Sequence, residues 1–476
     1  MPTVKFLSLV THHLRPRFGV SRLAYRRWLA PSHLAILTFA GLILAGTLLL
    51  MLPAASTGSG LSWVDALFTA TSAVCVTGLV VVDTGTDLSR FGQWVVLLLI
   101  QCGGLGIMTF STVFILFLGG RLSFLGRTVI QDTFTHGPDT RLASLIKHVL
   151  LLTLILEALG AALLFLRFAG MYPPGQALFY SLFHAISAFC NAGFCLYPNS
   201  FEGFQQDFLL NLTIAVLIIT GGLGFLVLME TRRRLFSRRT PLKVRRLSVH
   251  SKMVLILTLL LLTVGTLGFL LFEWHGSLGD LPLPDKLMAA FFQSVTTRTA
   301  GFNTLDFGKM ASITLFFTIS LMFIGAGSGS TAGGIKVNTL GVLLALSRAR
   351  LRGEEAVNIF HRTLSSAVVG RAIAVFAVSL VVVHAATMVL VMTEMGFTPQ
   401  AQNGKLFLEL LFEVVSAFGT VGLSTGVTPT LSSTGKLILV LVMFTGRLGP
   451  LAIVLGLFGK ERKVKLEYGE SSVMIG

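Results

Sequence analysis

Charged residues are scarce in this sequence of 476 residues. They account for 12% of the chain, whereas an ordinary soluble domain carries about 25%. Cysteine is scarce too, and the 4 cysteines show neither zinc-ligand nor redox-pair spacing. The sequence also lacks an HExxH motif, a Walker phosphate loop and a GxGxxG turn after a strand. The composition excludes a soluble enzyme, a disordered regulator and a fibrous protein, the cysteine spacing argues against a disulfide framework, and the missing motifs argue against an enzyme.

Hydrophobic residues make up 53% of the chain, and the mean hydropathy is +0.82. Apolar runs recur, and a helix of about 20 apolar residues can cross a bilayer. Good examples are residues 33–52, 149–166, 209–228, 253–271, 313–324, 372–391 and 437–457. The sequence therefore predicts an all-α membrane protein that crosses the bilayer several times.

The basic residues show which side faces the cytoplasm. The net charge is +16, and 28 of the 37 Lys and Arg residues lie in segments 1–33, 119–148, 231–252, 346–371 and 460–476. Short cytoplasmic loops of membrane proteins are enriched in Lys and Arg. We therefore expect eight transmembrane helices and two cytoplasmic termini. The basic loops suit anionic lipids or a protein partner, and nucleic-acid binding is not expected because topology explains the charge.

A short motif that ends in glycine and an apolar residue occurs four times. The copies are SAVCVTGL (72–79), SAFCNAGF (187–194), VTTRTAGF (295–302) and SAFGTVGL (416–423). Their glycines, Gly78, Gly193, Gly301 and Gly422, are 115, 108 and 121 residues apart. A period this regular indicates four tandem units. Each unit has an apolar span, a short semi-apolar segment, the motif and a second apolar span.

The segments before the motifs, such as 63–71 and 406–415, are too short to cross a bilayer and suit half-helices that enter it and return. Non-helical backbone at that depth is tolerated only where it is buried in protein or lines a water-filled path. Four such loops around one axis would form a ring of carbonyl oxygens, which can replace the hydration shell of an ion. The negative C-terminal ends of the half-helices would favour a cation.

Three stretches, 71–79, 294–303 and 329–336, resemble the Trk/Ktr/HKT superfamily of potassium transporters, and the similarity covers nearly the whole chain. Within it, the chain looks most like KtrB, the membrane subunits of bacterial Ktr potassium uptake systems, because only a short basic tail precedes the first span. The resemblance implies an all-α integral membrane fold in which four helix–pore-loop–helix repeats surround one pore in pseudo-fourfold symmetry.

With this resemblance, the chain divides into six parts. They are a basic cytoplasmic N-terminal tail (1–32), pore repeat 1 (33–118), pore repeat 2 (143–234), pore repeat 3 with an intramembrane gating loop (249–350), pore repeat 4 (365–460) and a cytoplasmic C-terminal tail (461–476).

The resemblance also implies a selectivity filter that binds K+ through backbone carbonyls. The matching residues are Val76, Thr77 and Gly78; Asn191, Ala192 and Gly193; Thr299, Ala300 and Gly301; and Thr420, Val421 and Gly422. In this superfamily glycine at all four positions goes with potassium, whereas serine at the first goes with a preference for sodium. The four glycines therefore favour potassium.

Two features below the filter are gate candidates. The stretch 325–334 holds too many glycines for a stable helix, since each costs about 1 kcal/mol relative to alanine. The resemblance makes it an intramembrane loop that restricts the pore, with gate residues Gly325, Gly327, Ser328, Gly329, Ser330, Thr331, Gly333, Gly334 and Lys336. Arg447 is a charge within an apolar span, where it is expensive and usually faces a cavity or a partner. By resemblance it lines the pore below the filter and completes the gate.

The function implied is potassium uptake across the bacterial cytoplasmic membrane, often dependent on sodium, for which the sequence places no site. The resemblance implies a homodimer on a ring of cytosolic, KtrA-like RCK subunits, which would bind ATP or ADP. This chain itself shows no cofactor site. Three alternatives stay open: a sodium-selective or non-selective cation channel, an ion-coupled symporter with alternating access, and a membrane scaffold without transport.

Overall fold

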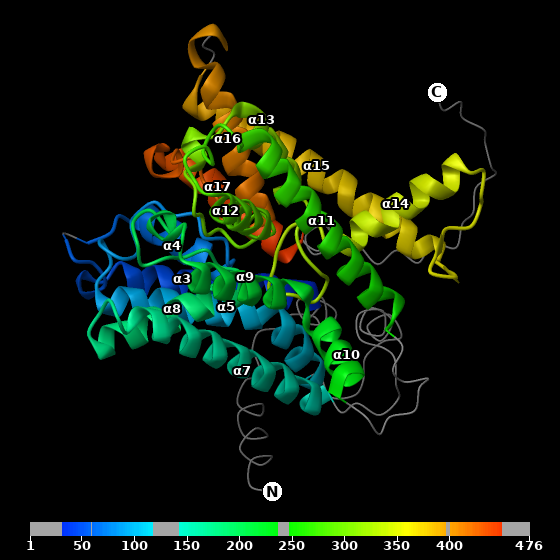
Figure 1. The fold of residues 1–476 in the computed structure, drawn as a ribbon, viewed down its shortest axis with the longest axis horizontal. Coiled ribbons are helices and arrows are strands. Elements are labelled where there is room, and N and C mark those ends of the chain that lie inside the picture. Colours follow the sequence, from blue (N-terminus) through cyan, green and yellow to red (C-terminus); the bar gives the residue numbers. More distant parts are fainter. Residues whose placement is uncertain (1–30, 59, 118–141, 237–246, 397–399, 450–476) are drawn as a thin grey trace, which may run out of the picture.

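The structure is a computed structural model, and it describes residues 31–58, 60–117, 142–236, 247–396 and 400–449. Most of the predicted N-terminal tail, the end of repeat 4 and the C-terminal tail lie outside these residues. The described elements are α3 (Pro31–Leu50), η1 (Pro53–Ala55), α4 (Trp63–Val74), α5 (Arg90–Phe117), α7 (Leu142–Phe168), α8 (Pro174–Phe189), η2 (Glu202–Phe204), α9 (Phe208–Leu223), α10 (Phe225–Phe236), α11 (Val249–Glu273), α12 (Leu283–Thr296), η4 (Phe307–Lys309), α13 (Ser312–Phe323), α14 (Val337–Leu351), β1 (Asn358–Ile359), β2 (Arg362–Thr363), α15 (Ser366–Glu394), α16 (Gln400–Gly419), η5 (Thr428–Thr430) and α17 (Ser433–Leu448) (Figure 1).

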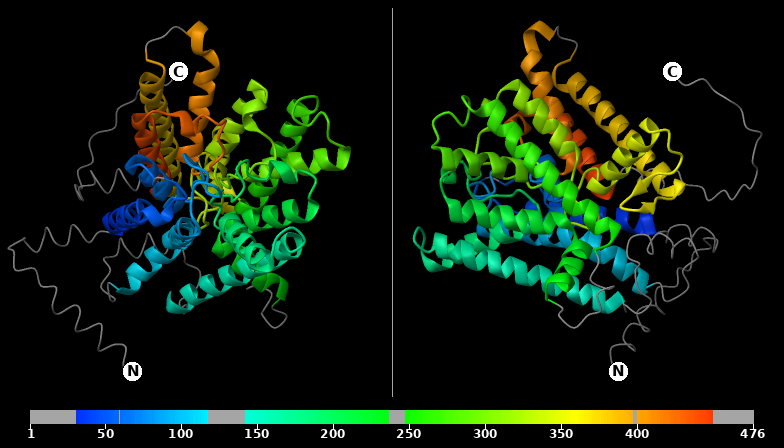
Figure 2. Two further views of the ribbon diagram at one scale, coloured as in Figure 1. Left: turned by 90° about the vertical axis from the view of Figure 1, so that its left-hand side faces the viewer. Right: turned by 45° about the vertical axis from the view of Figure 1, so that its right-hand side comes forward.

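The helices pack in four groups. Within the groups, α3 contacts α4 and α5, α7 contacts α8 and α9, α11 contacts α12, α13 and α14, and α15 contacts α16 and α17. Between the groups, α5 contacts α7 and α8, α9 contacts α12, and α13 contacts α16 (Figure 2). Helix α17 also contacts α4, so the last group meets the first. The four groups therefore close on themselves.

Each group contains one helix that ends in a glycine motif: α4, α8, α12 or α16. Residues typical of helix N-termini stand at the starts of three of these helices. Ser62 caps α4 by accepting a hydrogen bond from the Asp65 N–H, and proline stands in the first turn of α8 and of α12, where its missing N–H costs nothing. The other helices of each group pack against them and bury many of their side chains. This burial fixes the position of the loop that follows each one.

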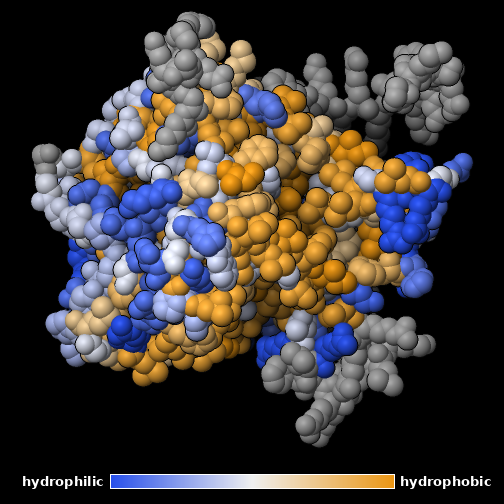
Figure 3. All heavy atoms as spheres, turned by 45° about the horizontal axis from the view of Figure 1, so that its top comes forward, coloured by the Kyte–Doolittle hydropathy of each residue, from blue (hydrophilic) through white to orange (hydrophobic). Residues whose placement is uncertain are grey.

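Three described helices are long and apolar enough to cross a membrane: residues 147–168 of α7, α11 and α15. A bent pair, 208–223 with 225–232, makes a fourth. Shorter apolar helices cover 36–50 and 312–323. In Figure 3, hydrophobic residues form a broad band between hydrophilic groups at two ends of the visible face. The count of eight spans stays a prediction.

One of the predicted spans is a bent pair of helices. The apolar run 209–228 bends by 101° between α9 and α10, at Gly224, which has a φ of 88°. A Cβ at this residue would lie 2.9 Å from the Ser328 carbonyl oxygen. The break therefore makes room for the glycine-rich stretch after α13, a neighbour that hydropathy alone does not reveal.

Candidate functional site

The four loops after α4, α8, α12 and α16 share one backbone conformation. The second residue before each motif glycine has a positive φ although it is not glycine: Val76 (55°), Asn191 (60°), Thr299 (68°) and Thr420 (48°). The glycines have φ values of 92°, 70°, 81° and 91° in the same order. Left- and right-handed residues therefore alternate. This alternation turns successive N–H groups to one side, as in backbone nests, and the carbonyl groups to the other.

Hydrogen bonds show which side the N–H groups take. The Thr77 N–H donates to the Ser72 carbonyl (2.8 Å), and the Gly78 N–H donates to the Ser72 hydroxyl (3.1 Å). The fourth loop repeats this pair on Ser416 at 2.8 and 3.1 Å. The N–H groups thus face the preceding helix, so the carbonyls are left for the opposite side. The third loop differs, because the residue matching Ser72 is Val295.

The structure brings the four motif glycines together in a closed ring. A Cβ at Gly78 would lie 2.4 Å from the Ala192 carbonyl oxygen, and one at Gly193 would lie 2.9 Å from that of Ala300. A Cβ at Gly301 would lie 2.6 Å from the Val421 oxygen. One at Gly422 would lie 2.1 Å from the Thr77 oxygen, which returns to the first loop.

Real Cβ atoms do not approach backbone closer than about 3 Å. Glycine is therefore required at each ring position for two reasons: its positive φ disfavours a side chain, and a Cβ would collide with the next loop. The residues that precede the ring glycines are buried: Thr77, Ala192, Ala300 and Val421. The fourfold repeat predicted that these loops surround one axis, and the structure adds which carbonyl each glycine approaches.

A buried polar side chain holds the chain that follows each motif, and the sequence did not single out this set. The Gln93 amide donates to the carbonyls of Thr84, Gly85 and Leu88 at 3.2 Å. His184 accepts from the Leu196 N–H (3.2 Å) and bonds the Tyr180 carbonyl (2.8 Å), which makes the ring neutral with the proton on Nδ1.

The other two members lie in the third and fourth groups. With its amide turned so that the oxygen faces these donors, the Gln293 side chain accepts from the N–H groups of Leu305 (2.8 Å) and Thr304 (3.1 Å). The Glu413 carboxylate accepts from Ser424, Thr425 and Thr428. His184 and Glu413 stood in the short segments before the motifs, yet only the fold shows what they hold.

The stretch between α13 and α14 is an ordered loop, as its glycine content predicts. It pairs with itself through the Gly325 N–H and the Ile335 carbonyl (2.8 Å), and with the end of α9 through the Gly327 N–H and the Gly222 carbonyl (2.9 Å). Thr331 Oγ1 donates to the Phe189 carbonyl at 3.3 Å. The loop therefore contacts the end of α8.

The far part of this loop lies against the fourth motif. A Cβ at Gly333 would lie 2.1 Å from Thr420 Oγ1, and one at Gly334 would lie 3.3 Å from the Gly419 Cα. The Lys336 ammonium donates back to the carbonyls of Ala332 and Gly333, so it anchors the loop end. Ser328 accepts from the Asn338 amide (3.3 Å), and the Ser330 hydroxyl accepts from the Ala332 N–H (3.3 Å).

Arg447 joins this loop to two helices. It lies in the last turn of α17 and is 5% exposed. Its guanidinium donates to the Thr331 carbonyl of the loop and to the Gly103 carbonyl of α5, the latter at 2.8 Å. Among the described residues it has no carboxylate partner. The sequence located the charge, and the fold supplied these two acceptors.

Many acidic residues of the predicted outer segments have structural partners. Asp65 pairs with Lys436 (2.8 Å) across the junction of α4 and α17, and Asp207 caps α9 and pairs with Arg167. Glu202 accepts a hydrogen bond from Asn303 (2.8 Å). Burial, with the nearby Asp306 charge, raises the pKa of the Glu202 carboxyl above its ordinary value. Structural contacts therefore hold these carboxylates, and they do not form a uniformly free acidic surface.

Comparison with known proteins identifies the family of this chain. Residues 27–462 match the family described as "TrkH: Cation transport protein". The chain is 43% identical to "Ktr system potassium uptake protein B" of Bacillus subtilis (strain 168), over 94% of this chain and 97% of that protein. It is 38% identical to "Potassium/sodium uptake protein NtpJ" of Enterococcus hirae, over 95% and 98%.

The fold is also known from a solved structure, the potassium transporter TrkH from Vibrio parahaemolyticus. The TM-score is 0.71 at 20% identity, over 93% of this chain and 86% of that one. The class is therefore that of helical membrane transporters of cations. The chain belongs to the TrkH family of cation transport proteins.

Proposed function

We propose that this chain takes up potassium across the cytoplasmic membrane through the ring of Gly78, Gly193, Gly301 and Gly422. The observation that carries the proposal is the closed ring, in which each glycine approaches the carbonyl of the next loop. Carbonyl rings of this kind replace the water around K+. The names of the Bacillus and Enterococcus relatives, both potassium uptake proteins, agree with this cargo.

The loop of residues 325–336 and Arg447 form the gate in this proposal. The loop contacts the ends of α8 and α16, from which two of the filter segments start. Arg447 holds it by the Thr331 carbonyl and places a positive charge beside the path. A cation that leaves the filter therefore meets both a steric and an electrostatic barrier. Opening requires the Arg447 contacts to break or the loop to move.

The regulatory surroundings follow the family expectation. We propose a homodimer on a ring of cytosolic nucleotide-binding subunits, with ATP or ADP bound by the partner and sodium as an activator. The described segments next to the predicted inner loops are the end of α10, the end of α14 and the start of α15, and they lie on one side of the molecule (Figure 1). That side is rich in Arg, which suits the cytoplasmic face.

Growth at limiting potassium tests the proposal. The full chain, expressed in a bacterium without its own potassium uptake, is expected to restore growth on low potassium and uptake of Rb+ as a tracer. Because one relative carries sodium in its name, a second candidate is uptake of both ions. Competition by Na+ at the Rb+ uptake step separates the two. No uptake from verified, membrane-inserted protein with its partner present would overturn the proposal.

A further inference from the structure

Arg298 is a buried charge that the potassium path does not use. It directly precedes Thr299 of the third motif and is 6% exposed. Within the described residues its guanidinium makes a long hydrogen bond, 3.4 Å from Nη1 to the Thr258 carbonyl of α11. Its Nε has no hydrogen-bond partner within the part of the chain that the structure describes. Arginine is always charged in proteins, and a buried charge is paired or bound to a counter-ion.

Thr258, whose carbonyl accepts from Arg298, also has a side-chain donor without a hydrogen-bond acceptor. Thr258 Oγ1 is buried and also has no partner among the described residues. A threonine in a membrane helix normally donates to the carbonyl four residues earlier, as Thr263 and Thr266 of the same helix do at 2.9 and 2.8 Å. The Thr258 hydroxyl makes no such hydrogen bond within its helix. Two donors that belong to different elements are therefore left without an acceptor in one place.

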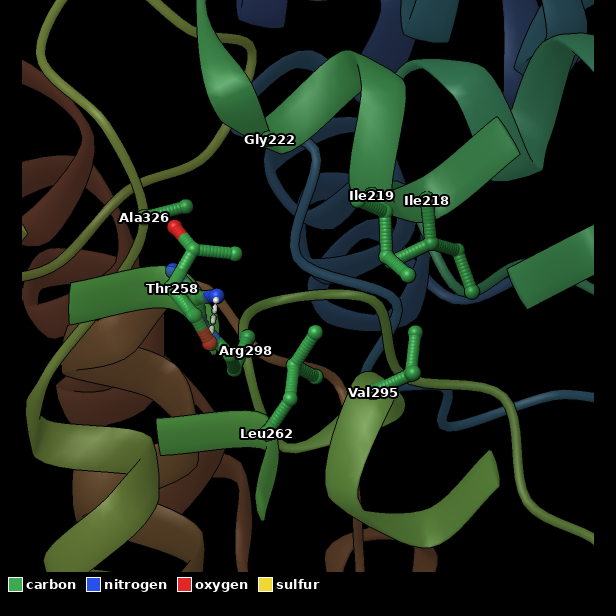
Figure 4. Close-up of a pocket in the computed structure, with 8 residues that line it drawn as sticks. All are labelled: Ile218, Ile219, Gly222, Thr258, Leu262, Val295, Arg298 and Ala326. Atoms are coloured by element: carbon green, nitrogen blue, oxygen red, sulfur yellow. Dashed lines mark hydrogen bonds between the residues drawn. The ribbon is translucent and has the colours of Figure 1, made fainter. Parts of the chain in front are cut away.

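Both residues line one small pocket between α9 and α11. Figure 4 shows Thr258 and Arg298 together on one side, with apolar side chains opposite them. The apolar lining is Ile218, Ile219, Leu262, Val295 and Ala326, closed by Gly222. The centre of a water-sized sphere can move through about 10 Å3 of this cavity, which leaves room for one monatomic solute.

We infer that this pocket binds a monatomic anion, chloride under ordinary conditions. The ligand must carry a negative charge, because the positively charged Arg298 guanidinium would repel a cation. The size of the pocket excludes a carboxylate with a chain or a lipid headgroup. Water would satisfy the donors but leave the charge uncompensated at membrane depth, where charge is costly. One halide accepts from both Arg298 and Thr258 Oγ1 and rests against aliphatic groups.

The site has a consequence for cation binding, and this step rests on the proposed function. Arg298 adjoins Thr299, whose carbonyl belongs to the proposed filter. An uncompensated positive charge there lowers the affinity of the filter for K+. Bound chloride neutralises it, so chloride and K+ bind with positive coupling. Coupling of two sites is reciprocal and commonly amounts to about 5- to 150-fold in affinity.

Anomalous scattering from crystals of the full chain tests binding directly. In potassium bromide we expect one bromide peak in contact with the Arg298 guanidinium and Thr258 Oγ1. Separate crystals in rubidium chloride report on the glycine ring. A rubidium peak without a bromide peak overturns the anion site and leaves the proposed function intact. A bromide peak without a rubidium peak supports the anion site while counting against the ring.

Uptake of Rb+ into proteoliposomes tests the coupling. Replacing chloride with gluconate is expected to raise the KM for Rb+ about fivefold or more. Arg298→Gln removes this dependence, and Thr258→Val shifts it to higher chloride. Thr263→Val is the matched control, since its hydroxyl bonds its own helix. If Arg298→Gln does not fold, the chloride dependence of Thr258→Val still tests the coupling. If the KM for Rb+ does not change with chloride although a bromide peak is present, the halide binds at crystal concentration only and the coupling is overturned.

Discussion

Replacing Gly422 with alanine probes the glycine ring at its tightest point. The new Cβ would lie 2.1 Å from the Thr77 carbonyl oxygen. Because Cβ atoms keep about 3 Å from backbone, this carbonyl must shift by about 1 Å. The φ of 91° adds a conformational cost, which is about 1–2 kcal/mol for a residue with a side chain. The substitution therefore strains two filter segments at once.

A cost of about 1.4 kcal/mol changes a rate or equilibrium constant tenfold. We expect Gly422→Ala to lower kcat/KM for Rb+ uptake at least about tenfold and to reduce discrimination against Na+, because the displaced Thr77 carbonyl is a proposed ligand. The assay is tracer uptake into proteoliposomes at fixed membrane potential, with Na+ as competitor. Protein amount is matched by size-exclusion profile.

Gly426→Ala is the matched control. Gly426 has nearly the same φ, 93°, but a Cβ there meets nothing within 4 Å. It thus carries the conformational cost without the collision. Equal loss of uptake in the two variants, or unchanged uptake and selectivity in Gly422→Ala, would refute the reasoning that close approach in the ring carries selectivity.

Four further predictions follow from the site. Gly78→Ser, whose Cβ would meet the Ala192 oxygen at 2.4 Å, is expected to bring the Rb+ and Na+ uptake rates closer together; unchanged rates count against the ring. Shortening residues 327–330 is expected to raise uptake measured without the cytosolic partner, and no change means that the loop is not the gate. Arg447→Gln removes charge-assisted bonds worth about 1.5–3 kcal/mol each and should also raise uptake; a fall with intact folding contradicts this. Because the pKa of Glu202 is raised, its charge is lost early as pH falls, so the KM for Rb+ should rise on acidification in the wild type; in Glu202→Gln it should already be high and change less. Equal pH profiles of the two proteins would exclude Glu202 as the group whose protonation raises the KM for Rb+.

The helical elements were largely predictable because their signals are local. The apolar run 149–166 falls within α7, and the run 33–52 lies in α3 except for its last two residues, since a helix satisfies its own backbone groups and needs only apolar side chains to enter a membrane. The loop around 325–334 was predictable for the same reason, because glycine weakens a helix wherever it stands. The break at Gly224 was not, since it depends on the carbonyl of Ser328 in a distant segment.

The sequence by itself determined the class of the protein, four glycine motifs at regular spacing, an arginine within the last apolar run and an excess of basic residues in a few segments. These are properties of composition and period. Only the tertiary structure decided that Gly422 meets Thr77, that Arg447 takes its acceptors from Thr331 and Gly103, and that Arg298 shares a pocket with Thr258. Hydrogen bonds and close packing act over a few ångströms, so partners far apart along the chain exist only once the fold has placed them.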